Sequence, residues 1–182
     1  MMDRRRFLLG AATLAATSLA TIPPFSDAEA ANPIRIRMVN AHTNEKLDLP
    51  YRVGTSYSRQ AIIFISDFMR DWRQERAVVM DPRLIDLLAY IQKKAGASEP
   101  ITLLSGYRTR ETNEMLRRYS SEVATRSFHM RGQAADIRIP GVSPLRIRDI
   151  AREIQVGGVG YYPSSNFVHV DTGPVRYWTP KG

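Results

Sequence analysis

Two short segments of the chain hold two of its three histidines, and each segment also carries an aspartate. The first contains His129 and Asp136, and the second contains His169 and Asp171. Two imidazoles and one carboxylate can form a three-ligand zinc site that leaves one coordination position for water. Because the chain has no cysteine, a metal would have to be held by nitrogen and oxygen ligands alone.

For these side chains to meet, the two segments must lie next to each other in the fold. Residues two apart in a strand face the same way, so neighbouring strands could present Asp136 and His169 side by side. A turn containing Gly132 could fold His129 back onto the same point. Spacing alone leaves a second interpretation open, in which the histidines are unrelated core or surface residues and the aspartate is a hydrogen-bonded carboxylate.

Apolar periodicity predicts the elements that would position these segments. Helical spacing extends over 58–72, 81–94 and 143–154, and Thr109 or Thr112 could cap a short polar helix that runs to Arg118. Apolar runs and alternating patterns predict strands at 34–39, 101–105, 134–139, 158–162 and 167–170. Locally paired strands without a regular βαβ rhythm favour an α+β fold, with a mainly antiparallel central sheet flanked by helices.

The first thirty residues are typical of an export signal. Arginines at 4–6 precede an apolar run over 8–22, and Ala28–Glu29–Ala30 offers a small-residue cleavage site. Paired arginines ahead of such a run indicate the twin-arginine route. The run is shorter than the roughly 20 residues of a membrane span. We therefore expect residues 1–30 to be removed and residues 31–182 to form a single domain with no membrane span.

Composition limits the partners and the chemistry of this domain. The net charge of +8 suits attraction to polyanions such as cell-wall polymers. The basic residues are dispersed among acids, and no signature of a nucleic-acid reader accompanies them, so we expect no nucleic-acid partner. The absence of cysteine excludes a disulfide framework and a thiolate nucleophile. We expect a monomer.

The residues around the histidines carry a resemblance to a known family. The chain resembles the zinc peptidoglycan peptidases related to D-Ala-D-Ala carboxypeptidases and dipeptidases, and within them the exported murein endopeptidase branch. The segments that carry this resemblance span the mature chain: Asp67–Arg73, Ser105–Thr109, Ser127–Asp136, Gly157–Pro163 and Phe167–Gly173.

The resemblance implies a periplasmic enzyme that hydrolyses peptide cross-links of peptidoglycan with one Zn²⁺ per chain. It assigns the metal to His129, Asp136 and His169. It also implies that Arg108 reaches the scissile carbonyl or a substrate carboxylate, where a guanidinium can neutralise developing negative charge. A structural salt bridge is the alternative for Arg108. Ser127 is expected to hydrogen-bond near the site and orient the ligand loop, or to serve as a helix cap or turn residue.

The resemblance does not identify the residue that accepts a proton from water. In the related dipeptidases this base is a glutamate three residues before the last histidine, and here that position is Asn166. Asp171 shares a strand face with His169, so it could serve as the base or as the carboxylate that orients this imidazole. Two other functions remain open: a stem-peptide carboxypeptidase with the same site, and a catalytically inactive wall-binding module that keeps zinc for structure.

Four further residues have two interpretations each. Tyr161, Tyr162 and Trp178 could line a peptide groove, although aromatic residues near terminal strands are commonly packing residues. His42 falls in a polar turn and could contribute to substrate binding, although a surface role is expected for a turn histidine.

Overall fold

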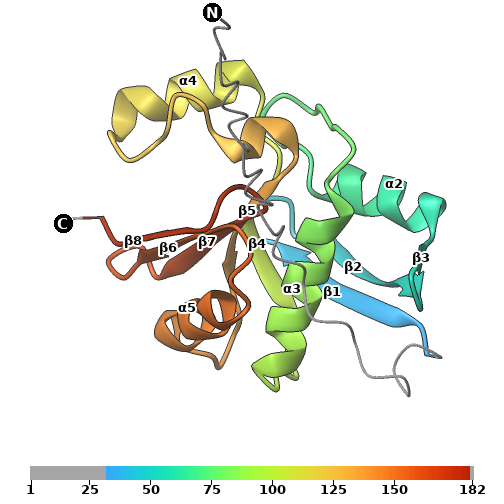
Figure 1. The fold of residues 1–182 in the computed structure, drawn as a ribbon. Coiled ribbons are helices and arrows are strands. Elements are labelled where there is room, and N and C mark those ends of the chain that lie inside the picture. The colour runs from blue at the N-terminus through green and yellow to red at the C-terminus, as the bar shows by residue number, and fades with distance from the viewer. Residues whose placement is uncertain (1–31, 181–182) are drawn as a thin grey trace, which may run out of the picture.

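An eight-stranded sheet forms the centre of the computed structural model, which describes residues 32–180 (Figure 1). The strand order is β3-β2-β1-β4-β5-β7-β6-β8. The strands are β1 (Ile34–Asn40), β2 (Lys46–Val53), β3 (Ser56–Tyr57), β4 (Ile101–Ser105), β5 (Ala134–Arg138), β6 (Gly158–Tyr162), β7 (Phe167–Asp171) and β8 (Arg176–Trp178). The helices are α2 (Arg59–Phe68), α3 (Pro82–Lys94), α4 (Arg110–Tyr119), the 3₁₀ helix η1 (Phe128–Arg131) and α5 (Pro144–Glu153).

The α+β class is confirmed, but the sheet is mixed and not mainly antiparallel as expected. β1 pairs with β4 in parallel, and β6 pairs with β8 in parallel. The first parallel pair arises because α2 and α3 lie between β3 and β4 and supply the long crossover that parallel neighbours need. The second arises because β8 follows β7 along the chain but lies on the far side of β6.

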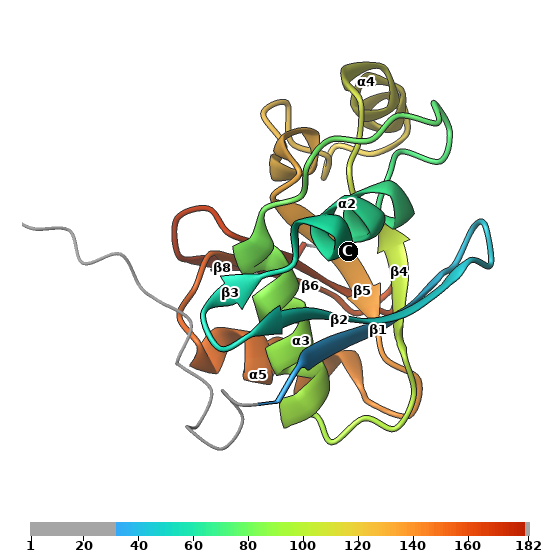
Figure 2. The ribbon, with the colours of Figure 1, turned by 90° about the vertical axis from the view of Figure 1, so that its right-hand side faces the viewer.

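Side-chain caps fix where the helices begin. The Ser58 hydroxyl accepts a hydrogen bond from the Ala61 amide at the start of α2. This helix ends at Phe68, so the expected continuation to Trp72 is wrong. Asp71 instead forms an isolated antiparallel bridge with Arg76. Figure 2 shows α2 alongside β2, which it contacts.

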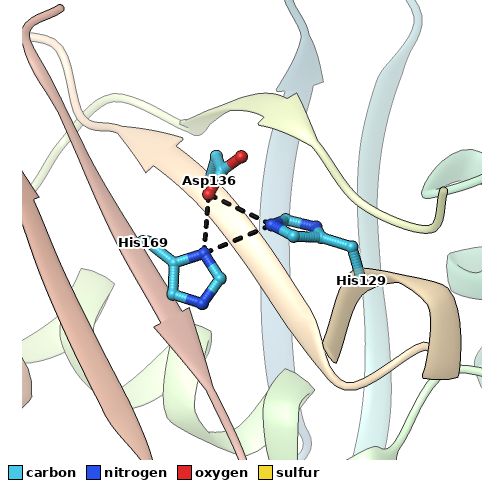
Figure 3. A group of neighbouring side chains, drawn as sticks. All are labelled: His129, Asp136 and His169. Atoms are coloured by element: carbon cyan, nitrogen blue, oxygen red, sulfur yellow. Dashed lines mark hydrogen bonds and ion pairs between the residues drawn. The ribbon is translucent and has the colours of Figure 1, made fainter. Parts of the chain in front are cut away.

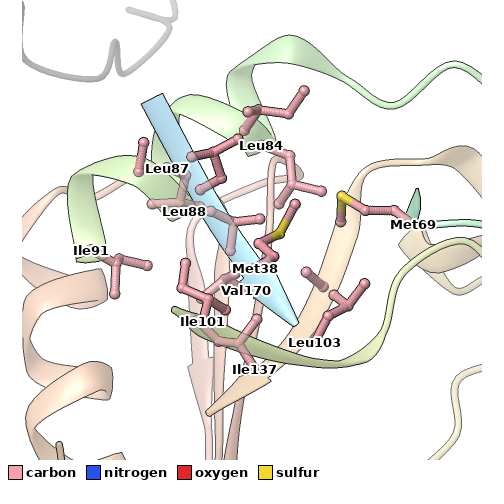
Figure 4. Close-up of a cluster of buried hydrophobic side chains, with 14 of the residues drawn as sticks. Met38, Met69, Leu84, Leu87, Leu88, Ile91, Ile101, Leu103, Ile137 and Val170 are labelled. Carbon is pink, nitrogen blue, oxygen red and sulfur yellow. The ribbon is translucent and has the colours of Figure 1, made fainter. Parts of the chain in front are cut away.

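The hydrophobic core lies between the sheet and the helices α2, α3 and α5. In Figure 4 the leucines of α3 pack against Met38 of β1 and Ile101 of β4. Within β5, Ile137 belongs to this core, whereas the neighbouring Asp136 points to the opposite face. Figure 1 shows α5 on one side of β5, β6 and β7, with α4 and η1 on the other. The polar side of these strands therefore faces α4 and η1.

The signal peptide expected at residues 1–30 lies outside the described residues. Among the helices of residues 32–180, none combines the length and the apolar character required to cross a membrane.

Candidate metal centre

The three residues expected to bind metal meet on the polar face of the sheet (Figure 3). The antiparallel register of β5 and β7 places Asp136 directly opposite His169, whose Nδ1 lies 2.8 Å from Asp136 Oδ1. His129 reaches the same point from η1, with its Nε2 3.2 Å from both of these atoms. All three residues are buried.

The loop that presents His129 is held at its start by Ser127. The Ser127 hydroxyl accepts a hydrogen bond from the His129 amide at 3.3 Å and thereby caps η1. Ser127 is buried and has no contact with Asp136 or His169 among the described hydrogen bonds. The observed contact is therefore the helix cap that was the alternative for Ser127, and it fixes the start of the helix that carries His129.

A backbone carbonyl that sequence reasoning missed fixes the tautomer of His129. The Gly106 carbonyl lies 2.7 Å from His129 Nδ1, and a carbonyl can only accept, so Nδ1 carries the proton and Nε2 presents a lone pair. Glycine is required here because a Cβ at position 106 would lie 2.4 Å from the Met69 carbonyl oxygen. The resemblance in Ser105–Thr109 drew attention to this segment, but it did not predict that the Gly106 carbonyl contacts His129.

Asp171 fixes the orientation of His169 in the same way. His169 Nε2 donates to Asp171 Oδ2 at 2.9 Å, which leaves Nδ1 facing the other two residues. Asp171 also accepts hydrogen bonds from the amides of Gly158 and Gly173, and its two oxygens bind the guanidinium of Arg176. Arg176 is a second supporting residue that the sequence pattern did not single out.

The three inner atoms fit a metal ion. Because the outer nitrogen of each imidazole donates its proton elsewhere, His129 Nε2, His169 Nδ1 and Asp136 Oδ1 all present lone pairs to one another. Such atoms repel at these separations unless a proton or a cation lies between them. Two imidazole nitrogens and one carboxylate oxygen form a donor set that is typical of catalytic zinc sites.

The electrostatics of the group favour a cation. Burial, followed by the positive charge of Arg108, lowers the pKa of His129 to about 4. Burial opposes ionisation of Asp136, yet the charges of His129 and Arg108 hold its pKa well below the usual range. Burial also opposes the charged form of His169, but hydrogen bonds to Asp136 and Asp171 raise its pKa. A metal ion would therefore compete with a proton at His169.

Arg108 is partly buried beside the candidate metal-binding group, which is formed by His129, Asp136 and His169. One of its guanidinium nitrogens binds Asp136 Oδ2, and Nε donates to the Ser105 hydroxyl at 2.7 Å. The next residue, Thr109, caps α4 and donates its amide and hydroxyl to the buried carboxylate of Asp71 at 2.9 Å. The salt bridge that was the alternative for Arg108 is thus present, and it places the guanidinium beside the site.

Asp171 is badly placed for the base role that the sequence left open. It is fully buried, does not line the pocket above the metal-binding group, and lies behind the His169 ring. Burial opposes its ionisation, but hydrogen bonds from His169 and Arg176 lower its pKa. These contacts support the orienting role. Asn166 lies in the turn between β6 and β7, where its backbone carbonyl accepts a hydrogen bond from Arg138 at 2.6 Å.

A pocket of about 430 Å³ opens above the metal-binding group. One wall is the segment between α4 and η1, and the other comes from β6, β7 and β8. Tyr162 and Trp178 line it, which agrees with the groove interpretation of these two residues, and the Trp178 indole donates to the Tyr162 hydroxyl at 3.0 Å. Glycine at position 160 leaves room for this indole, since a Cβ there would lie 2.5 Å from the ring. Tyr161 is not part of the lining and packs against the core.

Asp171→Asn tests the orienting role. We expect zinc affinity to fall about 10- to 100-fold, the effect typical of losing a carboxylate behind a metal-binding imidazole. Competition against a chromophoric chelator measures this affinity. Asp48→Asn is the matched control, since Asp48 is an exposed acid that pairs with Arg35. Unchanged zinc affinity with lost turnover at saturating zinc would instead support Asp171 as the base.

Comparison with known proteins places this site in a family. The family model described as peptidoglycan L,D-endopeptidase MepK matches residues 28–178. The MepK protein of Escherichia coli K12 is 40% identical over 177 residues, which cover 97% of each chain. The probable MepK of Haemophilus influenzae is 41% identical over 140 residues, covering 76% of this chain and 75% of the relative.

Among solved structures, the L-Ala D-Glu endopeptidase ChiX of Serratia marcescens aligns with a TM-score of 0.34 and 18% identity, over 42% of this chain and 62% of its own. A similarity of this extent supports no conclusion about the fold or the function of this chain. The matches to the family model and to the full-length relatives are sufficient: the chain belongs to the peptidoglycan L,D-endopeptidase MepK family.

Proposed function

We propose that this chain is a zinc-dependent L,D-endopeptidase that hydrolyses peptide cross-links of peptidoglycan. The observation that carries the proposal is the convergence of His129 Nε2, His169 Nδ1 and Asp136 Oδ1 beneath a pocket, in a chain that matches the MepK family over most of its length. These three residues would hold the ion. When bound, zinc acts as a Lewis acid that polarises a carbonyl and makes water a better nucleophile.

The residues around the ion prepare the pocket for a peptide. Arg108 can stabilise negative charge that develops on the carbonyl oxygen, because its guanidinium lies beside Asp136 and lines the pocket. Tyr162 and Trp178 offer apolar faces with polar edges for the peptide chain. A guanidinium and two aromatic rings suit a ligand that carries both amide bonds and carboxylates.

The proposed substrate also implies a location. Peptidoglycan lies outside the cytoplasmic membrane, so we propose that the chain is exported and that residues 31–182 act there as one monomeric domain. The twin-arginine pattern at residues 4–6 supports export by that route.

Digestion of purified cross-linked muropeptides by the full chain tests the proposal. We expect chromatography and mass spectrometry to show cross-linked dimers converted to monomers in the presence of zinc. A chelator should stop the conversion, and added zinc should restore it, because the ligand set holds the ion reversibly. Free terminal D-Ala without dimer cleavage would identify a carboxypeptidase. Intact dimers with zinc bound would identify an inactive wall-binding module.

A further inference from the structure

The pocket above the metal-binding group is lined by two carboxylates, those of Glu122 and Asp136. Asp136 is fully engaged, since Oδ1 contacts both imidazoles and Oδ2 binds Arg108. Its role as a ligand leaves it no capacity to accept a proton from water. Glu122 is the other acid of the lining, and it occupies the wall formed by the segment between α4 and η1.

The segment that carries Glu122 is anchored at both ends. At its start the Glu122 amide donates to the Ser120 hydroxyl at 3.2 Å. In its middle the Ala124 carbonyl accepts a hydrogen bond from the Asn113 side chain of α4 at 3.1 Å. At its end Ser127 caps the helix that presents His129. These contacts hold Glu122 on the same wall that delivers a metal ligand.

The Glu122 carboxylate is free to act on a ligand. Within residues 32–180 no hydrogen bond or ion pair engages its oxygens. Tyr162 lies on the opposite wall of the same pocket, where burial raises the pKa of its hydroxyl and the negative charges of Asp136 and Glu122 contribute to the same shift. The Glu122 charge therefore acts on a side chain that borders the metal-binding group.

We propose that Glu122 is the proton acceptor of the hydrolysis. This inference rests on the proposed function. It assigns the general base, for which the resemblance gave no matching residue. Position 166, where the related dipeptidases carry a glutamate, is an asparagine here, and Asp171 lies behind the His169 ring. The carboxylate is supplied across the pocket, from the segment between α4 and η1, and not from the strand that carries His169.

The step balances without any further reactant. As a water oxygen bonds to the scissile carbonyl carbon, one water proton moves to the Glu122 carboxylate. When the C–N bond breaks, this proton passes to the leaving nitrogen, and Glu122 returns to its ionised form. The products are a carboxylic acid and an amine, and transfer of the second water proton between them gives a carboxylate and an ammonium group. Arg108 faces the oxygen on which negative charge collects, and Glu122 faces the water.

Replacement of Glu122 by glutamine keeps its size and removes its basicity. We expect Glu122→Gln to lower kcat on cross-linked muropeptides by about 100-fold, the lower end of the effect of a general base. KM and bound zinc, measured by mass spectrometry of the metal, should stay at wild-type values. Glu122→Asp should keep part of the activity, since it retains a carboxylate on a shorter side chain.

The pH profile separates this role from a structural one. The wild-type profile of kcat/KM should have an acidic limb that is lost in Glu122→Gln. The charged and titratable groups that line the pocket around Glu122 are Arg108, Arg126, Arg176, Tyr162 and the metal-binding residues, and all of them remain in the variant. Glu114→Gln is the matched control, since Glu114 is an exposed acid of α4 outside the pocket.

The outcomes distinguish this inference from the proposed function. If wild-type protein with bound zinc leaves the muropeptides intact, the proposed function is wrong, and the inference falls with it. If wild type cleaves them and Glu122→Gln does so at the same rate, only the role of Glu122 is wrong. Parallel loss of zinc and activity in Glu122→Gln would also overturn it, because it would show a structural effect on the metal site.

Discussion

Zinc is expected to raise the thermal unfolding temperature of the wild-type chain but not that of His169→Ala, which should show no measurable cleavage of cross-linked muropeptides. A ligand stabilises a fold when it binds the folded state alone. His169→Ala removes one of three buried donors, and the remaining pair, His129 and Asp136, is too small a set to hold the ion at a catalytic site. Differential scanning fluorimetry with and without zinc measures the stabilisation.

The third histidine of the chain supplies the control for this prediction. His42 lies apart from the metal-binding group, where its ring stacks on Trp72 at 4.6 Å between centroids and its Nε2 contacts the Leu104 carbonyl at 3.0 Å. His42→Ala should keep both the zinc-dependent stabilisation and the cleavage. A zinc response of equal size in His169→Ala and wild type would show that the ion binds elsewhere.

The site could be predicted from the sequence because strand periodicity acts over short distances. Alternation along β5 and β7 places Asp136 and His169 on the polar face and Ile137 and Val168 on the core face, whatever the rest of the sheet does. The turn at Gly132 then brings His129 to the same point. These relations depend on residues close together in the chain or on adjacent strands.

Features that depend on the path of the whole chain could not be predicted in this way. The two parallel pairings follow from where β4 and β8 join the sheet, which no local pattern encodes. The contact between the Gly106 carbonyl and His129 joins two distant segments through a backbone atom that any residue would have. Glu122 lies in a segment without periodicity, so only its position in the lining of the pocket indicates a role for it.

Strand periodicity also could not predict which way the ring of His169 turns. Asp171 and His169 share a face, as expected, and this left Asp171 open as either base or orienting carboxylate. The choice depends on the rotation of the His169 ring, which turns Nδ1 toward Asp136 and Nε2 toward Asp171. The hydrogen bonds from Arg176 and two backbone amides then occupy Asp171 and exclude it from the pocket.

Arg108→Ala is expected to lower kcat by about 10²- to 10³-fold, the loss typical of removing one donor that stabilises a developing oxyanion. Arg108 binds Asp136 through one nitrogen and Ser105 through Nε, so the guanidinium is fixed in place before substrate arrives. This preorganisation is what makes a donor effective in the transition state. Arg108→Lys keeps the charge but loses the planar fork, so its kcat should lie between those of wild type and Arg108→Ala.

The same experiment decides between the two roles considered for Arg108. If it stabilises the oxyanion, kcat falls while bound zinc, measured by mass spectrometry, stays near one ion per chain. If it serves only to hold Asp136, the loss of activity should follow the loss of zinc, because Asp136 without its cationic partner is a weaker and less ordered ligand. Arg35→Ala is the control, since Arg35 is half exposed and pairs with Asp48 at the surface. Activity that returns fully on zinc addition to Arg108→Ala would therefore assign Arg108 to the metal site alone.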